Sequence, residues 1–230
     1  MSADATPDPI GFLLCFAVRE EAAFAWPMQV KGGSERLITG MGRRNASTRF
    51  HEALNRLSPE RVITCGFAGA LNPQFKVGDV LFDEDFDMGM DKALLAAGAI
   101  PGKFYCSVRV AVTATEKAEL WRTTGADAVE MESAVIRSLC RDRGIPSATV
   151  RVISDAASED LPLDFNALMT SDQKLSIPKL MGTLLKSPSA IPRLMDLQRN
   201  TRAAAQRLAQ ILRTSLGAGG DLLTRGVRPV

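Results

Sequence analysis

Hydrophobic and polar positions along the chain predict strands that alternate with helices. Short segments rich in apolar and β-branched residues have the length of buried strands, and they lie at residues 12–18, 35–40, 61–67 and 148–153. Between them, apolar residues recur at helical spacing in one stripe: Ala46, Phe50, Ala53, Leu54 and Leu57. This alternation predicts a mostly parallel or mixed sheet that helices cover on both faces.

The segment 126–160 predicts a helix, a tight turn and a buried strand, with carboxylates at both ends. Met131, Val135 and Leu139 recur at near-helical spacing, and Gly144 followed by Pro146 marks the end of the helix. Residues 154 and 155, a serine and an aspartate, follow the strand at its carboxyl end. Ligands of open α/β sheets bind at this edge.

The remaining segments complete a single predicted domain over residues 1–230, with flexible ends at 1–10 and 217–230. We expect a short helix at 93–97, a strand near 104–112, and mostly helix from 160 to about 216 with an interruption near 187–192. The helix at 192–212 is basic and amphipathic. It would either close the sheet or make a peripheral contact with a membrane or a partner.

Composition excludes several classes of protein. Hydrophobic residues make up 46% and charged residues 23% of the chain, which is typical of a soluble globular protein. The amino terminus lacks the basic region of a signal peptide, and no apolar run reaches the ~20 residues that span a bilayer, so we expect a cytoplasmic protein. The net charge of +2 and the absence of aromatics among the last helix's basic residues argue against a nucleic-acid partner.

The side chains available for metal and redox chemistry are few. His51 is the only histidine, which argues against histidine triads and multi-histidine metal sites. The four cysteines show no CxxC pairing and predict buried thiols in a reducing compartment. An acidic stretch lacks the spacing of a calcium loop, so it predicts a solvated loop: Asp83, Asp85, Asp87 and Asp91. We therefore expect no metal.

Two motifs in the second half resemble one enzyme family. Val129-Glu130-Met131-Glu132 is followed, 23 residues after Glu132, by the end of Arg151-Val152-Ile153-Ser154-Asp155. This pattern resembles the purine nucleoside phosphorylase / uridine phosphorylase superfamily, and in particular the methylthioadenosine/adenosylhomocysteine nucleosidases. The small-residue run from Gly66 to Leu71 resembles the family's GxAGxL segment. Residues 124–133, 150–165 and 189–197 look most like the hopanoid-associated branch, which is proposed to remove adenine from adenosylhopane.

The resemblance covers nearly all of residues 12–215 and implies a three-layer α/β/α phosphorylase-type fold with a central mixed sheet. It implies cleavage of the N-glycosidic bond of an adenine nucleoside that carries a 5′ substituent. Asp155 would be the general acid toward N7 of the purine, which requires that burial favour its protonated form. Glu132 would bind the ribose hydroxyls, Met131 would pack beneath the sugar, and Glu21 would activate water. Other residues expected to contact the nucleoside are Phe67, Ala68, Gly69 and Ser154.

Two departures from the family pattern affect the expected site. Many nucleosidases place serine where this chain has Phe67, and Thr113-Ala114-Thr115 stands in the place of a segment with an aromatic residue that stacks on the purine. The candidates to replace that aromatic are Phe86, Phe104 and Tyr105, although each also suits the core.

The sequence leaves open whether the nucleophile is water or phosphate. Gly42 and Arg43 open a helix after a glycine-rich turn and form a candidate phosphate or nucleophile site, with Arg19 and Arg44 nearby. Glu21 would repel phosphate and favours water. The resemblance implies no cofactor, apart from phosphate as a co-substrate, and a homodimer.

Each proposed carboxylate also has a structural interpretation. Glu21 and Glu132 would be exposed glutamates in the first turn of a helix, where the helix dipole favours them, and Asp155 would cap a helix. The alternative function is a non-catalytic nucleoside-binding protein or a membrane-associated scaffold.

Overall fold

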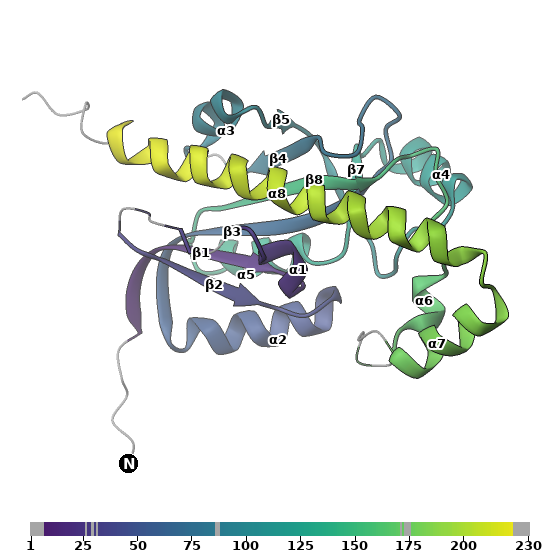
Figure 1. The fold of residues 1–230 in the computed structure, drawn as a ribbon. Helices are drawn as coiled ribbons and strands as arrows, with labels where there is room; N and C mark the ends of the chain where they lie inside the picture. Colours follow the sequence, from purple (N-terminus) through teal and green to yellow (C-terminus); the bar gives the residue numbers. More distant parts are fainter. Residues whose placement is uncertain are drawn as a thin grey trace, which may run out of the picture.

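The computed structural model describes residues 7–25, 27–28, 30, 32–85, 88–170, 172 and 176–222. Within these residues, eight strands form one sheet (Figure 1). The main path runs in the order β2 (Ser34–Ile38), β1 (Asp8–Phe16), β3 (Leu57–Ala70), β8 (Ser147–Asp155), β4 (Val80–Glu84) and β5 (Ile100–Pro101). Off this path, β7 (Ala128–Glu130) pairs with β3, and β6 (Phe104–Cys106) pairs with β7.

The sheet is mixed, as the sequence predicts. Strands β2, β1, β3 and β8 run parallel, whereas β4 runs antiparallel to β8 and β7 runs antiparallel to β3. Strand β1 begins earlier than expected, because Asp8 and Ile10 pair with Leu57 and Pro59 of β3. The prediction of a flexible end at residues 1–10 is therefore wrong for residues 8–10, and residues 1–6 lie outside the described part.

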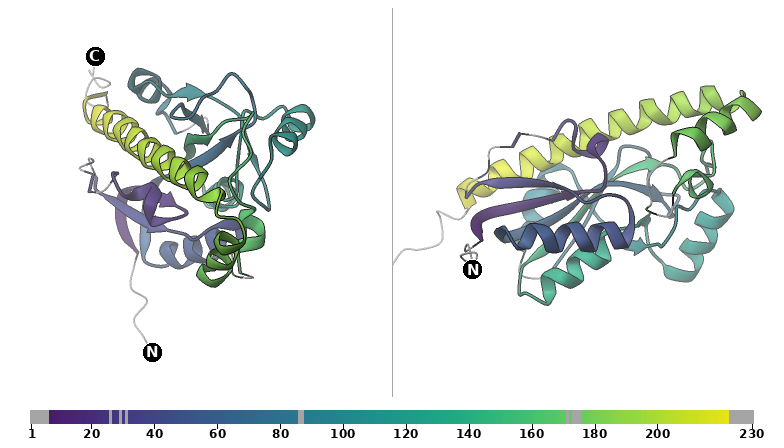
Figure 2. Two further views of the ribbon diagram at one scale, coloured as in Figure 1. Left: turned by 45° about the vertical axis from the view of Figure 1, so that its right-hand side comes forward. Right: turned by 90° about the horizontal axis from the view of Figure 1, so that it is seen from below.

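Helices cover both faces of the sheet, which gives the predicted three-layer α/β/α fold (Figure 2). Side chains alternate along a strand, so Leu13 of β1 packs against α2 (Gly42–Leu54) and α5 (Ser133–Arg141). Its neighbour Leu14 packs toward the other layer. That layer contains α1 (Arg19–Ala22), α3 (Asp91–Ala97) and α8 (Ala190–Leu222).

Helix α8 crosses one face of the sheet along much of its length (Figure 1). Its apolar stripe is buried in the core and comprises Ala204, Leu208, Ile211 and Leu212. Each fully buried leucine or isoleucine contributes ~1.5–3 kcal/mol to stability. The interpretation of this segment as a closing helix is therefore correct, and its apolar stripe is not available to a membrane. The helix continues to Leu222, past the predicted flexible boundary at residue 217, and residues 223–230 lie outside the described part.

The region between β6 and β8 differs from the expected pattern. The strand predicted near residues 104–112 is limited to Phe104–Cys106, because the chain turns to begin α4 (Ala114–Thr124). Thr113 caps this helix by accepting a hydrogen bond from the Glu116 amide at 3.1 Å, and the Glu116 carboxylate accepts from the Val112 amide. The Thr113-Ala114-Thr115 segment thus has a structural role as a helix start.

The acidic stretch that begins at the end of β4 is not simply solvated. Arg137 of α5 forms ion pairs with Asp83 and with Asp85, and the second of these is 2.8 Å long. Asp91 lies in the first turn of α3, and Phe86 and Asp87 lie outside the described part. No group of three or more potential metal-ligating side chains occurs among the described residues.

Two short helices stand at one end of the molecule, α6 (Phe165–Leu168) and α7 (Ile177–Lys186) (Figure 1). They pack through a small apolar cluster centred on Leu163, Leu168 and Ala190. As predicted, Cys15, Cys65 and Cys140 are buried free thiols, whereas Cys106 is a half-buried free thiol. Among the described residues, no helix is long and apolar enough to cross a membrane.

Candidate active site

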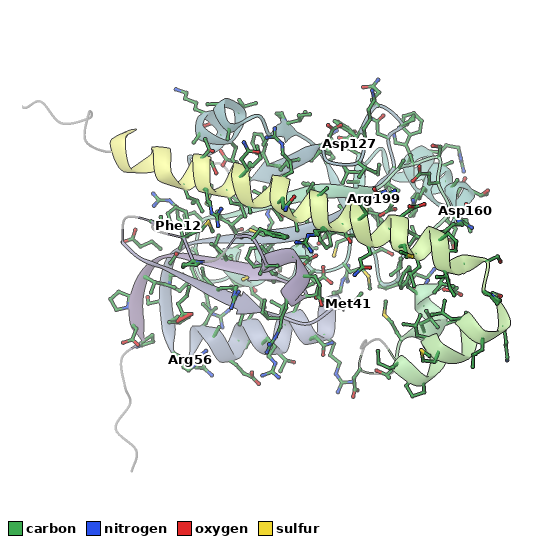
Figure 3. All side chains as sticks on the ribbon, viewed as in Figure 1. Phe12, Met41, Arg56, Asp127, Asp160 and Arg199 are labelled. Carbon is green, nitrogen blue, oxygen red and sulfur yellow. The ribbon has the colours of Figure 1, made fainter. Side chains whose placement is uncertain are left out.

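A cavity of about 290 Å³ opens at the carboxyl ends of β1, β3 and β8. Parallel strands deliver their carboxyl ends to the same edge of a sheet, and ligands of α/β proteins bind there. In Figure 3, Met41 and Asp160 lie toward this end of the molecule, and Arg56 lies toward the opposite end. The cavity brings together eight residues that the sequence predicts for the site: Glu21, Phe67, Ala68, Gly69, Met131, Glu132, Ser154 and Asp155.

Glu21 joins the ends of two neighbouring strands. Glu21 belongs to the short helix α1, yet only 4% of its surface is exposed. Oε2 accepts hydrogen bonds from the amides of Ala17 at 2.7 Å and Val18 at 3.1 Å, and Oε1 accepts one from the Phe67 amide at 2.9 Å. Burial raises the pKa of Glu21, although Arg151 and these amides oppose the shift. The interpretation of Glu21 as a solvated first-turn glutamate is wrong.

Gly66 makes this arrangement sterically feasible. A side-chain carbon added at this glycine would collide with the Glu21 carboxylate and with the Arg151 guanidinium, and the φ angle of +152° also favours glycine. The sequence predicts that the small-residue run from Gly66 to Leu71 admits a nucleoside. At Gly66 the space admits two charged side chains of the protein itself.

A buried ion pair lies beneath the cavity. Arg151 of β8 donates to Glu130 Oε2 at 2.7 Å and to the Cys65 carbonyl at 3.0 Å, and its side chain is 1% exposed. The amides of Glu132 and Ser133 also donate to Glu130 Oε2, at 2.9 and 2.7 Å. Burial alone would raise the pKa of Glu130, but Arg151 and these donors lower it. Glu130 therefore remains a carboxylate that balances the Arg151 charge.

Glu132 lies just before α5 and is buried, with 6% of its surface exposed. Its Oε1 accepts a hydrogen bond from the Gly42 amide at 2.7 Å, and its Oε2 lies 3.6 Å from Arg151 Nη2. Burial raises the pKa of Glu132 to about 7, with Arg151 opposing the shift and Glu130 and Glu21 adding to it. The interpretation of Glu132 as an exposed first-turn residue is wrong.

The predicted anion site at the start of α2 is not part of the cavity lining. The Gly42 amide is occupied by Glu132, and Met41 is the residue of this turn that lines the cavity. Arg43 is exposed and donates to the Cys106 carbonyl at 3.4 Å. Arg19 and Arg44 are also exposed and outside the lining. Among the lining residues the arginine is Arg109, which pairs with Glu116 at 2.5 Å.

Asp155 ends β8 at the cavity wall, and no helix begins there, so the interpretation of Asp155 as a helix cap is wrong. Its Oδ1 accepts a hydrogen bond from the Ser154 hydroxyl at 2.7 Å. Its Oδ2 pairs with the Lys117 ammonium at 2.6 Å. The carbonyls of Ala156 and Glu159 also accept from Lys117, at 2.8 and 2.9 Å.

Lys117 is an unexpected ion-pair partner of Asp155. Its side chain is fully buried, and three acceptors surround its three N–H groups. The ion pair and the Ser154 hydroxyl together fix the position of the Asp155 carboxylate at the cavity wall. Sequence reasoning missed Lys117, because Glu116-Lys117 in a polar helix resembles a surface pair.

The aromatic residues of the cavity are Phe67 and Phe165. Phe165, at the start of α6, is not among the sequence candidates for a purine-stacking residue. Of those candidates, Phe104 packs into a cluster with Ala68 and Ile153, Tyr105 lies outside the lining, and Phe86 is outside the described part. The path of the chain after β8 brings Phe165 to the cavity. That path leaves no signal in the sequence, which is why the sequence does not predict Phe165.

The chain matches the family model of the phosphorylase superfamily over residues 33–97 and 82–216. Aminodeoxyfutalosine nucleosidase of Campylobacter jejuni is 23% identical, over 59% of this chain and 73% of that protein. The 5′-methylthioadenosine/S-adenosylhomocysteine nucleosidase of Glaesserella parasuis is 28% identical, over 58% of this chain and 72% of that protein.

Solved structures confirm the fold. Futalosine hydrolase of Helicobacter pylori superimposes with a TM-score of 0.67 at 15% identity, covering 91% of this chain and 98% of that one. A methylthioadenosine/adenosylhomocysteine nucleosidase of Colwellia psychrerythraea in complex with adenine superimposes with a TM-score of 0.66 at 17% identity, covering 93% of this chain and 97% of that one. The family model covers most of the chain, and the chain belongs to the phosphorylase superfamily.

Proposed function

We propose that this protein hydrolyses the N-glycosidic bond of an adenine nucleoside that carries a 5′ substituent. The observation that carries the proposal is the convergence of Glu21, Glu132 and Asp155 on one cavity. Three separated strand ends supply these carboxylates, each of them held by hydrogen bonds or an ion pair. The nucleosidases named above, which share 23% and 28% identity with this chain, support the same reaction.

Each carboxylate has a distinct task in this reaction. Positive charge grows on the sugar as the bond to the base breaks, so carboxylates near the sugar stabilise the transition state. Glu132 accepts hydrogen bonds from the ribose 2′ and 3′ hydroxyls, and Met131 packs beneath the sugar. Asp155 delivers a proton to N7 so that the base leaves as neutral adenine. Phe67, Ala68, Gly69 and Ser154 contact the nucleoside.

Phe165 takes the place of the missing aromatic residue in this proposal. It lines the cavity together with Leu161 and with Leu197 of α8, so the wall on this side is apolar. A flat apolar ring at the wall suits stacking on a base. The apolar wall also suits a hydrophobic 5′ substituent, which agrees with adenosylhopane of hopanoid biosynthesis as a candidate substrate.

Glu21 makes water the favoured nucleophile. Phosphorolysis requires a cationic cradle for phosphate, and arginine normally supplies it. Here Arg19, Arg43 and Arg44 lie outside the lining, and Arg109, the arginine of the lining, is paired with Glu116. The Glu21 carboxylate is inside the lining. A carboxylate repels phosphate and can accept a proton from water. Phosphate as a co-substrate is therefore the disfavoured alternative. By resemblance to the family, the working form is a homodimer.

The substrate is tested by measuring adenine release from methylthioadenosine and from an adenosine with a long 5′-alkylthio chain. We expect release from both by the wild-type protein and loss of release in Asp155→Asn. A higher kcat/KM for the long-chain substrate would support the hopanoid-type assignment. Binding of both compounds without release of adenine by the wild type would reject the enzyme in favour of a nucleoside-binding protein.

A further inference from the structure

Helix α7 and the first turns of α8 form a hairpin, residues 176–202, whose outer surface is unusually apolar. Among the described residues, ten large apolar side chains are exposed, and half of them lie on this hairpin. Their exposed fractions range from 43% to 78%. They are Ile177, Met181, Leu185, Ile191 and Met195. Exposed apolar residues that gather in one place mark an interaction surface more often than scattered ones do.

The periodicity of α7 shows that packing within the chain does not explain this surface. Leu180 and Leu184 face inward and pack against the cluster formed with α6 and Ala190. Ile177, Met181 and Leu185 recur at intervals of four on another face, which is open to solvent. One apolar face thus holds the helix in place, and the second has no partner among the described residues.

The hairpin is also strongly basic. Five basic residues and one acidic residue lie between residues 176 and 202, a net charge of +4. The basic residues are exposed and comprise Lys179, Lys186, Arg193, Arg199 and Arg202. Arg199 pairs with Asp196, whereas Lys179 and Arg193 donate to backbone carbonyls and form no ion pair with a described residue.

We propose that this hairpin docks on an anionic membrane surface. Apolar side chains beside exposed lysines and arginines are typical of helices that lie in the interface of a lipid bilayer. Negative lipid head groups attract such basic segments. A second copy of this chain is a poorer occupant, because a two-fold interface would place the same positive surfaces against each other.

This proposal is independent of the reaction, although the two surfaces adjoin. Leu197 and Thr201 of the same hairpin line the cavity, and so does Phe165 of α6. Docking would therefore hold the cavity beside the lipid surface. A protein with this geometry can collect an apolar ligand from the membrane without releasing it into water.

The test is co-sedimentation of the full chain with vesicles of phosphatidylcholine alone and of phosphatidylcholine with phosphatidylglycerol. We expect the wild type to sediment with the anionic vesicles and to be released by high salt. The double variant Met181→Glu/Leu185→Glu should lose at least about tenfold in vesicle affinity. It should keep its fold, because Met181 and Leu185 are 53% and 78% exposed and the inward-facing leucines of α7 are unchanged.

Leu95→Glu on α3 is the matched control, since Leu95 is 49% exposed and lies outside the hairpin. It should bind vesicles like the wild type. The proposal is overturned if the wild type stays in the supernatant with anionic vesicles, or if Leu95→Glu lowers binding as much as the double variant. A double variant that dissociates a dimer in sedimentation velocity but still binds vesicles would assign the surface to self-association and also overturn it.

Discussion

The Lys117 ammonium lies 2.6 Å from Asp155 Oδ2, with the lysine side chain fully buried and the aspartate side chain 13% exposed. The Asp155 carboxylate also accepts a hydrogen bond from the Ser154 hydroxyl at 2.7 Å, so two groups of the protein fix the position of the proposed general acid. Lys117 itself does not line the cavity. It is therefore a positioning residue that acts on the reaction through Asp155.

Replacing Lys117 by methionine should lower the activity and the stability of the protein together. Without the ammonium group, Asp155 loses the ion pair that positions it, so kcat should fall by roughly 10²-fold. Stability should fall by about 3–5 kcal/mol, because the variant removes one partner of a buried ion pair. Lys117→Arg retains the charge and should lose less of both. A Lys117→Met variant with a lower Tm but an unchanged kcat would show that Lys117 has only a structural role.

Gly69→Ala should impair catalysis through the position of Asp155. A side-chain carbon at residue 69 would lie 2.9 Å from Asp155 Oδ2, so the carboxylate would have to move. A catalytic group that is misplaced by about 1 Å costs an enzyme roughly 10²-fold in kcat. Gly182→Ala is the control, since nothing lies within 4 Å of its added carbon. Steady-state kinetics should separate the two variants, and equal activities would contradict the proposed position of Asp155.

Glu132 should make stability depend on pH in a defined direction. Burial raises its pKa from 4.5 to about 7 in the folded protein, so folding favours the protonated form. The contribution of Glu132 to the free energy of unfolding is complete below the pKa of Glu132 in the unfolded chain. It is lost as the pH rises through about 7. The Tm of the wild type should therefore fall relative to the Tm of Glu132→Gln as the pH rises through this interval. A difference that does not vary with pH would contradict burial of an ionisable Glu132.

Phe165→Ala tests the stacking role of the cavity aromatic. Loss of stacking on a base costs ~1–3 kcal/mol, so kcat/KM should fall by about ten- to a hundredfold, mainly through KM. Phe165→Tyr should retain most of the activity because it keeps the ring. Tyr105→Ala, whose side chain lies outside the cavity, should match the wild type. Similar losses in the Phe165 and Tyr105 variants would reject the stacking role.

The carboxylates of the site could be predicted from sequence because each follows or ends a strand. Glu21 follows β1, Glu132 follows β7 and Asp155 ends β8. Strand order in the sheet then forces these ends together. Local apolar patterns locate β1 and β8, but they assign the residues of β7 to the following helix, which in the structure begins only at Ser133. The family motifs fall at the same places for the same reason.

Contacts between distant helices could not be predicted in this way. Lys117 belongs to α4, Phe165 belongs to α6, and their approach to the cavity depends on loop paths that leave no periodic signal. The amphipathic pattern of residues 192–212 predicts an apolar stripe but not what packs against it. A stripe that packs on a sheet and a stripe that contacts lipid have the same spacing. Only the fold shows that the sheet buries the stripe of α8 while α7 remains open.

The most direct test of the proposed hydrolysis is adenine release from methylthioadenosine with and without inorganic phosphate, with the sugar product identified by mass spectrometry. We expect equal rates in both conditions, a free sugar as product, and a loss of roughly 10²–10⁴-fold in Glu21→Gln. Release that requires phosphate and yields a sugar 1-phosphate, with Glu21→Gln retaining activity, would contradict the assignment of Glu21 as the group that activates water.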